Sequence, residues 1–583
     1  MKFIQRFGAI LLIIAAAFFV YAPALRNGFV WDDTALVLRD PLIRSWRLIP
    51  EGFRQFLFLD ATGANFYRPM QRVSFTLDYA LWGFGWPGGW HLTSIAVHAL
   101  AAIFLYLLLR RWWGEGRAWW AAGVALLWVI HPLHTSAVTY VAGRADPLAA
   151  MFGFAGLLLL WISLEEGRVK TGLWRLGAAG CFFGAVLSKE SGIIFMVLAL
   201  ALLIWRRVSR GEWLRWAVLL PVILGGYLLL RLTAAQTPPP ASKSRPVADR
   251  PVIAARAIAE YAGLIVAPVS LRMERDVASK QIEGAQAGRV SQGSNGQTLV
   301  GMILIVGLIA VFLWCRRSLP EAAVMIVAAG IAYFPISNVT SLNATVAEHW
   351  LYVPSAFLFA AGGLILRRWN SRIALAVVGL WAVALGVRTF VRQGDWYDGQ
   401  TFLLRTIEAG GDSARMRVNL GNIAAAAGNI DQAMAEYQAA LERRPNLAFA
   451  LLAIAGLEMK RGHFAEARKA LDLAEQQPGF ASEVRVVRGA LDFTEKKIDP
   501  TPVYREAAEL SPLNWPLRKR YLNALVLTGH LPVAIEELRA FLMAQDFRAE
   551  TWQYFAELLT QAGRPDLAAV AHEEARLRDV RLP

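Results

Sequence analysis

Cysteine is nearly absent from this sequence, and charged residues are scarce. Among 583 residues there are two cysteines, Cys181 and Cys315, which fall on opposite edges of the predicted topology and have no ligand-like spacing. We therefore expect no disulfide and no cysteine-based metal site. Only 18% of the residues are charged whereas 56% are hydrophobic, which excludes an ordinary soluble protein. The composition predicts a polytopic membrane protein.

The formal net charge of +15 does not indicate nucleic-acid binding. The arginines gather in short clusters between hydrophobic runs and form no continuous basic face, which is typical of membrane-topology signals. About eleven apolar runs are candidate membrane spans. They cover residues 8–25, 91–109, 118–131, 147–163, 175–188, 191–205, 214–231, 298–314, 320–336, 351–366 and 373–388.

Threading the chain through these runs places the arginine and lysine clusters on one side, which is cytoplasmic by the positive-inside rule. The N-terminus lies on that side. The loops after the first, third, seventh and ninth runs share the exoplasmic side with the C-terminal region. The first run also resembles a cleavable signal peptide around Ala22–Ala24, but its length and Pro23 favour retention as a span. Short loops and the lack of disulfides favour a bacterial inner membrane with a periplasmic C-terminal region; the endoplasmic reticulum membrane is the alternative.

The apolar runs end near residue 390, and a polar, alanine-rich sequence follows. We predict an all-α fold with a transmembrane domain over 1–395 and a helical repeat domain over 396–583. Four glycines recur at spacings of 34, 67 and 34 residues, each followed five positions later by alanine: Gly428, Gly462, Gly529 and Gly563. This period is the tetratricopeptide signature. About five repeats would form a solenoid whose groove accepts a peptide or protein segment.

Two adjacent carboxylates, Asp32 and Asp33, follow the first apolar run directly. A carboxylate at the membrane edge stays ionised and is well placed to act as a general base. Mutual interaction of the pair would raise the pKa of one member. The structural alternative is that the pair caps a following helix.

Further polar residues cluster in loops on the same predicted side, where ionisable groups near a membrane are site candidates. They are Tyr67, Arg68, His91, His131, Arg144, Asp146, Lys189, Glu190, Glu348, His349 and Tyr352. The structural alternative pairs Arg144 with Asp146 and Lys189 with Glu190, and leaves His131 and His134 to satisfy loop carbonyls. The two histidines lack a third ligand at useful spacing, so we expect no metal.

Several short motifs give the chain a resemblance to a known family. In order, they are Phe29–Asp33, Tyr67–Pro69, Trp82–Gly83, His91 with His98, His131–Pro132, Gly143–Asp146, Lys189–Glu190, Ser337–Asn338 and Glu348–Ser355. Together with the repeats, this series resembles the transmembrane and tetratricopeptide-repeat (TMTC) proteins, GT-C fold glycosyltransferases related to the protein O-mannosyltransferases. The resemblance covers nearly the whole chain.

The resemblance implies transfer of a sugar, mannose being one candidate, from a polyprenyl-phosphate carrier to a serine or threonine hydroxyl of a protein. It points to Asp32 as the base, with Asp33 as its partner or replacement, and to inversion at the sugar, because one base suffices for direct displacement. No cofactor is implied beyond the lipid-linked donor.

The leaving phosphate calls for cationic donors, for which Arg68, Arg144, Lys189, and His349 with Tyr352 are candidates. His349 and Trp350 depart from the arginine and tyrosine usual in the family, which puts the role of His349 in doubt.

Two other functions stay open. One is that of a non-enzymatic membrane scaffold, and the other is that of a glycosyltransferase that acts on a lipid or glycan. Convergence of Asp32, Asp33, Arg68, Arg144 and Lys189 on one face would favour the enzyme. In the loop 232–297, residues 251–268 are apolar enough for an interfacial or re-entrant helix. The resemblance implies that such a loop helps to cover the lipid carrier, which is a hypothesis for this chain.

Overall fold

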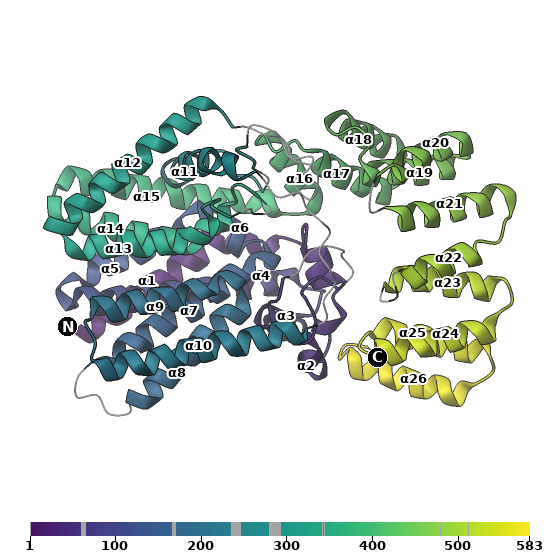
Figure 1. The fold of residues 1–583 in the computed structure, drawn as a ribbon, viewed down its shortest axis with the longest axis horizontal. Coiled ribbons are helices and arrows are strands. Elements are labelled where there is room, and N and C mark those ends of the chain that lie inside the picture. The colour runs from purple at the N-terminus through teal and green to yellow at the C-terminus, as the bar shows by residue number, and fades with distance from the viewer. Residues whose placement is uncertain are drawn as a thin grey trace.

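A computed structural model describes residues 2–59, 66–165, 171–234, 246–273, 275–278, 293–340, 342, 344–477, 480–510, 512 and 514–582. Within these residues every regular element is a helix, and one isolated β-bridge joins Arg275 to Val346. A bundle of long helices occupies one half of the molecule and an arc of paired short helices the other (Figure 1). The predicted all-α fold class is confirmed.

Each predicted apolar run coincides with a helix of the bundle. The helices are α1 (Lys2–Tyr21), α4 (Pro87–Trp113), α5 (Ala118–Ile130), α7 (Ala145–Ser163), α8 (Thr171–Ser188), α9 (Ile194–Trp205), α10 (Arg210–Thr233), α12 (Asn295–Ser318), α13 (Pro320–Tyr333), α14 (Tyr352–Trp369) and α15 (Arg372–Arg392). In the described part of the chain, 7 helices are long and apolar enough to cross a membrane, or 8 if the bent pair Glu115–Ile130 and Pro132–Val138 is one span. The number eleven therefore stays a prediction.

The outer helices of the bundle present apolar side chains to their surroundings. On α12, Ile303, Val306 and Ile309 are all more than half exposed, and α15 is similar. Such a surface would be unfavourable in water but suits contact with lipid tails. This pattern, with the long apolar helices, identifies a membrane protein.

The two ends of the bundle differ in chemistry. At the end that carries the N-terminus, arginines pair with the few acids, as in Arg111 with Glu165 at 2.6 Å and Arg175 with Glu212. The opposite end, called the outer end here, carries the loop 27–68, whose described residues 27–59 and 66–68 we call the outer loop. It also carries the solenoid (Figure 1). The acidic pair and the repeats thus share one end, as the sequence predicts.

Short elements build this outer end. They are η2 (Thr34–Leu38), α2 (Ile49–Gly52), α3 (Pro69–Trp82), α6 (Thr135–Val138), η7 (Val141–Arg144), η8 (Glu190–Ile193), α11 (Arg250–Val266) and η12 (Gln393–Trp396). The helix α11 matches the predicted segment 251–268 and packs against α12. Much of the loop around it lies outside the described residues.

The solenoid consists of α16 (Gly399–Glu408) followed by successive helix pairs. These are α17 (Ala414–Ala426) with α18 (Ile430–Arg443), α19 (Ala448–Arg461) with α20 (Phe464–Glu475), α21 (Ala481–Lys496) with α22 (Thr501–Leu510), α23 (Trp515–Leu527) with α24 (Leu531–Ala544), and α25 (Ala549–Gln561) with α26 (Pro565–Arg578). The repeated glycines adopt φ of +70° to +80° at the turn within a pair, where a side chain would be strained. The alanines five positions later are buried, which lets the helices approach closely.

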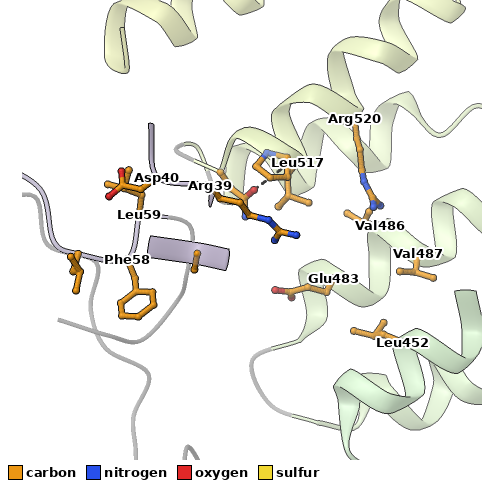
Figure 2. Close-up of a pocket in the computed structure, with 14 residues that line it drawn as sticks. Arg39, Asp40, Phe58, Leu59, Leu452, Glu483, Val486, Val487, Leu517 and Arg520 are labelled. Atoms are coloured by element: carbon orange, nitrogen blue, oxygen red, sulfur yellow. Dashed lines mark hydrogen bonds between the residues drawn. The ribbon is translucent and has the colours of Figure 1, made fainter. Parts of the chain in front are cut away.

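Both ends of the solenoid are attached to the outer loop. At its start, the Gly28 amide donates to the Tyr397 carbonyl at 2.8 Å. At its far end, the Asp579 carboxylate accepts a hydrogen bond from the Tyr79 hydroxyl at 2.6 Å and pairs with Arg44 at 3.2 Å. The arc is therefore closed, and a cavity of about 620 Å³ lies between it and the outer loop (Figure 2).

Replacing Asp579 by alanine removes the carboxylate that Arg44 and Tyr79 share. We expect this end of the solenoid to undock, since a lost hydrogen bond to a charged group costs about 1.5–3 kcal/mol. Hydrogen–deuterium exchange of the purified protein should then be faster around Arg44 and in α26. Asp566→Ala is the control, because Asp566 lies exposed on α26 and forms no ion pair with described residues. Equal exchange in the two variants would contradict the docking.

Candidate active site

The two acidic residues have different surroundings. Asp33 is fully buried, and its Oδ2 and Oδ1 atoms accept hydrogen bonds from the backbone amides of Val30 at 3.0 Å and Ala142 at 2.7 Å. Burial raises the pKa of Asp33 to about 7, although the two amide donors oppose that rise. Asp33 therefore ties the outer loop to η7, and both of its oxygens are engaged.

Asp32 is only partly buried and is free of such backbone ties. The Tyr140 hydroxyl accepts a hydrogen bond from the Asp32 amide at 3.2 Å and also contacts its carboxylate. Burial raises the pKa of Asp32, while Arg415, the Tyr140 hydrogen bond and Arg68 oppose the rise. A carboxylate with a raised pKa that keeps nearby cations fits a proton acceptor.

The turn that presents Asp32 is held by the solenoid. Trp31 has a φ of +54°, which is unusual for a non-glycine residue. Its ring lies 5.7 Å from that of Phe402 on α16, and the Arg415 guanidinium on α17 lies over it at 4.2 Å. The solenoid thus supplies one wall of the candidate site.

A second cluster of charged residues is centred on Glu190. The carboxylate accepts a hydrogen bond from the Tyr67 amide at 2.9 Å and pairs with Arg68 at 3.0 Å, while Arg231 on α10 lies at 4.0 Å. Arg68 also acts electrostatically on Asp32 and Lys189. This arginine links the acidic turn to the other charged groups of the outer end.

Lys189 pairs with Asp146 and not with Glu190. Its Nζ lies 2.6 and 2.7 Å from the two Asp146 oxygens, so the partner differs from that of the structural alternative. Burial lowers the pKa of Lys189, and Asp146 counteracts that effect. His349 lies within electrostatic reach of Lys189, Asp146 and Arg68. Arg68 and Lys189 therefore form a cationic cluster at the top of α9 and α14, with the His349 imidazole beside them.

Arg144 is fully buried and pairs with Asp78 at 2.5 Å, so the partner is not Asp146 as in the structural alternative. Its remaining donors reach the Trp90 carbonyl at 2.7 Å and the Ser94 hydroxyl at 3.0 Å. These bonds join α3, α4 and η7, because Asp78 lies on α3 and the other two partners on α4. The geometry favours a structural role for Arg144 over phosphate binding.

Several other candidate residues form contacts inside the protein. His131 contacts the Ile265 carbonyl at 2.9 Å, as expected, whereas both ring nitrogens of His134 lack a hydrogen bond within the described residues. Glu348 accepts the Arg272 amide at 2.6 Å, and the Tyr352 hydroxyl contacts His98 at 2.5 Å.

His91 is buried on α4. The described residues contain no group of three or more His, Cys, Asp or Glu side chains that could hold a metal ion. The expectation of a metal-free site stays a prediction.

The sequence did not single out Tyr140, Asp78, Arg231 or Arg415. Tyr140 lies close to the predicted loop motif, but nothing in its spacing indicates a contact with Asp32. Arg231 ends a predicted span, where an arginine reads as a topology signal. Arg415 lies in the other domain, so only the closed arrangement of the chain brings it to the acidic turn.

No protein-family model matches the chain. Over 456 residues it is 23% identical to Protein O-mannosyl-transferase F38B6.6 of Caenorhabditis elegans, which covers 75% of this chain and 63% of that protein. Over 522 residues it is 22% identical to Protein O-mannosyl-transferase TMTC2 of Homo sapiens, with coverage of 74% and 62%. A shorter match, 31% identical over 165 residues, is to TMTC1 of Mus musculus, with coverage of 27% and 17%.

These relatives confirm the resemblance to the TMTC proteins. The chain covers less than two thirds of the length of each of them. Among solved structures, MamA is 18% identical over 28% of this chain and 95% of its own, with a TM-score of 0.23. YrrB, described as a TPR protein with an unusual peptide-binding site, is 17% identical over 31% and 93%, with a TM-score of 0.22. Both scores are too low to indicate a shared overall fold.

Replacing Arg144 by alanine should destabilise the protein and should not selectively weaken the binding of a polyprenyl-phosphate donor. The change leaves the Asp78 carboxylate buried without its cation, which typically costs about 3–5 kcal/mol. Thermal unfolding in detergent would measure the loss. As a control, Arg539→Ala breaks an exposed pair with Glu536 and should change stability by less than about 0.5 kcal/mol. Unchanged stability with weakened binding of a polyprenyl phosphate would instead place Arg144 in the donor site.

Proposed function

We propose that this protein is a glycosyltransferase that moves a sugar, with mannose as the first candidate, from a polyprenyl-phosphate carrier to a serine or threonine hydroxyl of a protein. The observation that carries the proposal is the position of Asp32, held at the outer end beside Arg68 and Arg415. The similarity to protein O-mannosyl-transferases supports it. Convergence of Asp32, Arg68 and Lys189 favours an enzyme over a scaffold.

Asp32 would act as the base. An acceptor hydroxyl is a weak nucleophile, and a carboxylate within hydrogen-bond reach takes its proton as the oxygen attacks the anomeric carbon. One displacement with one base inverts the configuration at that carbon. Asp33 would position Asp32, because both Asp33 oxygens are engaged by backbone amides.

The departing lipid phosphate would be stabilised by the cationic cluster. Arg68, Lys189 and His349 offer fixed donors where negative charge develops on the leaving oxygen. Arg144 is left out because its side chain is 0% exposed, whereas the side chains of Arg68 and Lys189 keep 15% and 11% exposure. Tyr352, which contacts His98, would line the site from below without binding the phosphate.

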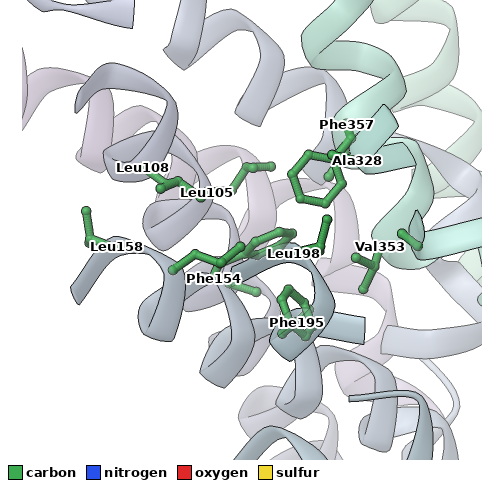
Figure 3. Packing of buried hydrophobic residues seen from close by; sticks show 14 of the residues in the cluster. Leu105, Leu108, Phe154, Leu158, Phe195, Leu198, Ala328, Val353 and Phe357 are labelled. Atoms are coloured by element: carbon green, nitrogen blue, oxygen red, sulfur yellow. The ribbon is translucent and has the colours of Figure 1, made fainter. Parts of the chain in front are cut away.

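The lipid tail would descend along the bundle below this cluster. An apolar crevice of about 30 Å³ lies between α4, α7, α9, α13 and α14, and Leu198, Ala328 and Phe357 line it. Figure 3 shows these three side chains in the hydrophobic packing of the bundle. A space of this size holds about two water molecules and no polyprenyl chain, so the tail would lie on the lipid-facing surface of the bundle with its phosphate at the membrane edge.

The outer end would face the exoplasmic side, because the basic clusters lie at the other end. We place the protein first in a bacterial inner membrane with a periplasmic solenoid, and second in the endoplasmic reticulum membrane. The solenoid would bring the protein acceptor to Asp32.

The first test is Asp32→Asn in purified protein given a panel of polyprenyl-phosphate sugars and protein acceptors. We expect transfer to fall by about 10²–10⁴-fold, since that is the usual contribution of a general base, while thermal unfolding and donor binding stay unchanged. Asp33→Asn should lower thermal stability along with activity, because it weakens the tie to Ala142. Full activity in Asp32→Asn would exclude it as the base. A wild type that neither binds donor nor transfers sugar would favour the scaffold.

The second test concerns pH. Arg415 holds down the pKa of Asp32, so Arg415→Ala should raise that pKa, and a base works only above its pKa. The acidic limb of the pH–rate profile should therefore move to higher pH. Arg415→Lys keeps the charge and should leave the limb close to that of the wild type. Identical profiles for the alanine variant and the wild type would show that Arg415 does not act on the base.

A further inference from the structure

The cavity between the outer loop and the solenoid has walls from both domains. The outer loop contributes Arg39 and Leu59, and the solenoid contributes Glu483 and Val486 from α21 and Arg520 from α23. Figure 2 shows Arg39 reaching from the outer loop towards Glu483 and Arg520. The first helices of consecutive repeats line the solenoid side, so this is the concave face of the arc.

The charges of this cavity are not neutralised within the protein. Arg39, Glu483 and Arg520 are exposed, and none of them forms an ion pair with a residue that the structure describes. Asp40 also lines the cavity, but it pairs with the buried Arg72 at 2.9 Å. Two cations and one anion are therefore left facing the space, which favours a ligand with an acidic group.

The cavity is close to the candidate base along the chain. The Ala35 and Leu36 amides donate to the Asp32 carbonyl at 3.0 and 2.8 Å, so Asp32 and the wall residue Ala35 belong to one helical turn. A ligand in the cavity therefore lies next to the turn that presents Asp32.

The shape of the cavity limits what can enter. The solenoid is fixed at its start by Gly28 and Tyr397 and at its far end by Asp579 with Arg44 and Tyr79. A folded domain is far larger than this cavity of about 620 Å³ and would not fit while both attachments hold. An extended chain can enter with both attachments intact.

We propose that this cavity binds an extended polypeptide segment of the acceptor, with an acidic side chain placed between Arg39 and Arg520. The inference rests on the proposed function, since it assigns the part of the acceptor that the enzyme recognises. Apolar side chains of the segment pack on Leu59, Val486 and Leu517, and Glu483 receives a basic side chain or a backbone amide. The polyprenyl donor is a poor occupant, because the walls carry four charged side chains and lie outside the helical bundle.

The test uses the full chain in lipid nanodiscs and a pool of short random peptides with a fixed central threonine. We expect the wild type to retain peptides with Asp or Glu near the threonine roughly tenfold better than those with Lys, as charge-assisted hydrogen bonds provide. The double variant Arg39→Glu and Arg520→Glu should lose or reverse this preference. Arg539→Glu, an exposed arginine of α24 outside the cavity, is the matched control. Thermal unfolding checks that each variant is folded.

A second measurement locates the bound peptide. In a chain with Cys181→Ala and Cys315→Ala, the substitution Val487→Cys puts a thiol on the cavity wall, and Lys469→Cys puts one on α20 outside it. An acidic peptide should slow alkylation of the first thiol at least several-fold and leave the second unchanged. Equal alkylation of the first thiol with and without peptide would overturn the proposed location.

The outcomes separate this proposal from the proposed function. An unchanged charge preference in the double variant overturns the acidic subsite, even if sugar is still transferred to peptides. Binding of a lipid-linked sugar or a free oligosaccharide in the cavity, without binding of any peptide there, also overturns it. Charge-selective peptide binding without transfer by any donor supports the subsite and contradicts the glycosyltransferase.

Discussion

The Asp33 carboxylate fixes the outer end of this protein, because it joins two backbone segments that are far apart in the chain. Its oxygens accept the amides of Val30 and Ala142, so the acidic turn cannot move independently of η7. The same short segment contains Arg144, which ties η7 to α3 and α4. The position of Asp32, and with it the proposed chemistry, depends on this connection.

The charged groups of the outer end fall into two classes. Arg72 with Asp40, and Arg144 with Asp78, are buried pairs that replace solvation by mutual contact and hold the helices together. Arg68 pairs with Glu190 and Lys189 pairs with Asp146, but these two side chains keep 15% and 11% exposure, and both act electrostatically on His349. In the proposed function only this second class would meet a phosphate, so residues of the same type would have different roles.

The solenoid contributes residues to the candidate site. Phe402 and Arg415 cover Trp31, and the last residues of the chain return to Arg44 and Tyr79. These contacts place the concave face opposite the outer loop and enclose a cavity between them. In the proposed function, acceptor choice and base position would therefore depend on the same few contacts.

The sequence by itself determined the helical fold class, the apolar runs, the repeat period and the acidic turn, because these follow from local periodicity and composition. The glycines that need positive φ and the alanines at helix contacts recur at a fixed period, so they can be recognised in the sequence alone. It did not determine which charges pair: neighbours suggested Arg144 with Asp146 and Lys189 with Glu190, but the partners are Asp78 and Asp146. Only the tertiary structure decided these pairs, the different surroundings of Asp32 and Asp33, and the approach of Arg415, since buried charges select partners by spatial proximity, which local sequence does not encode.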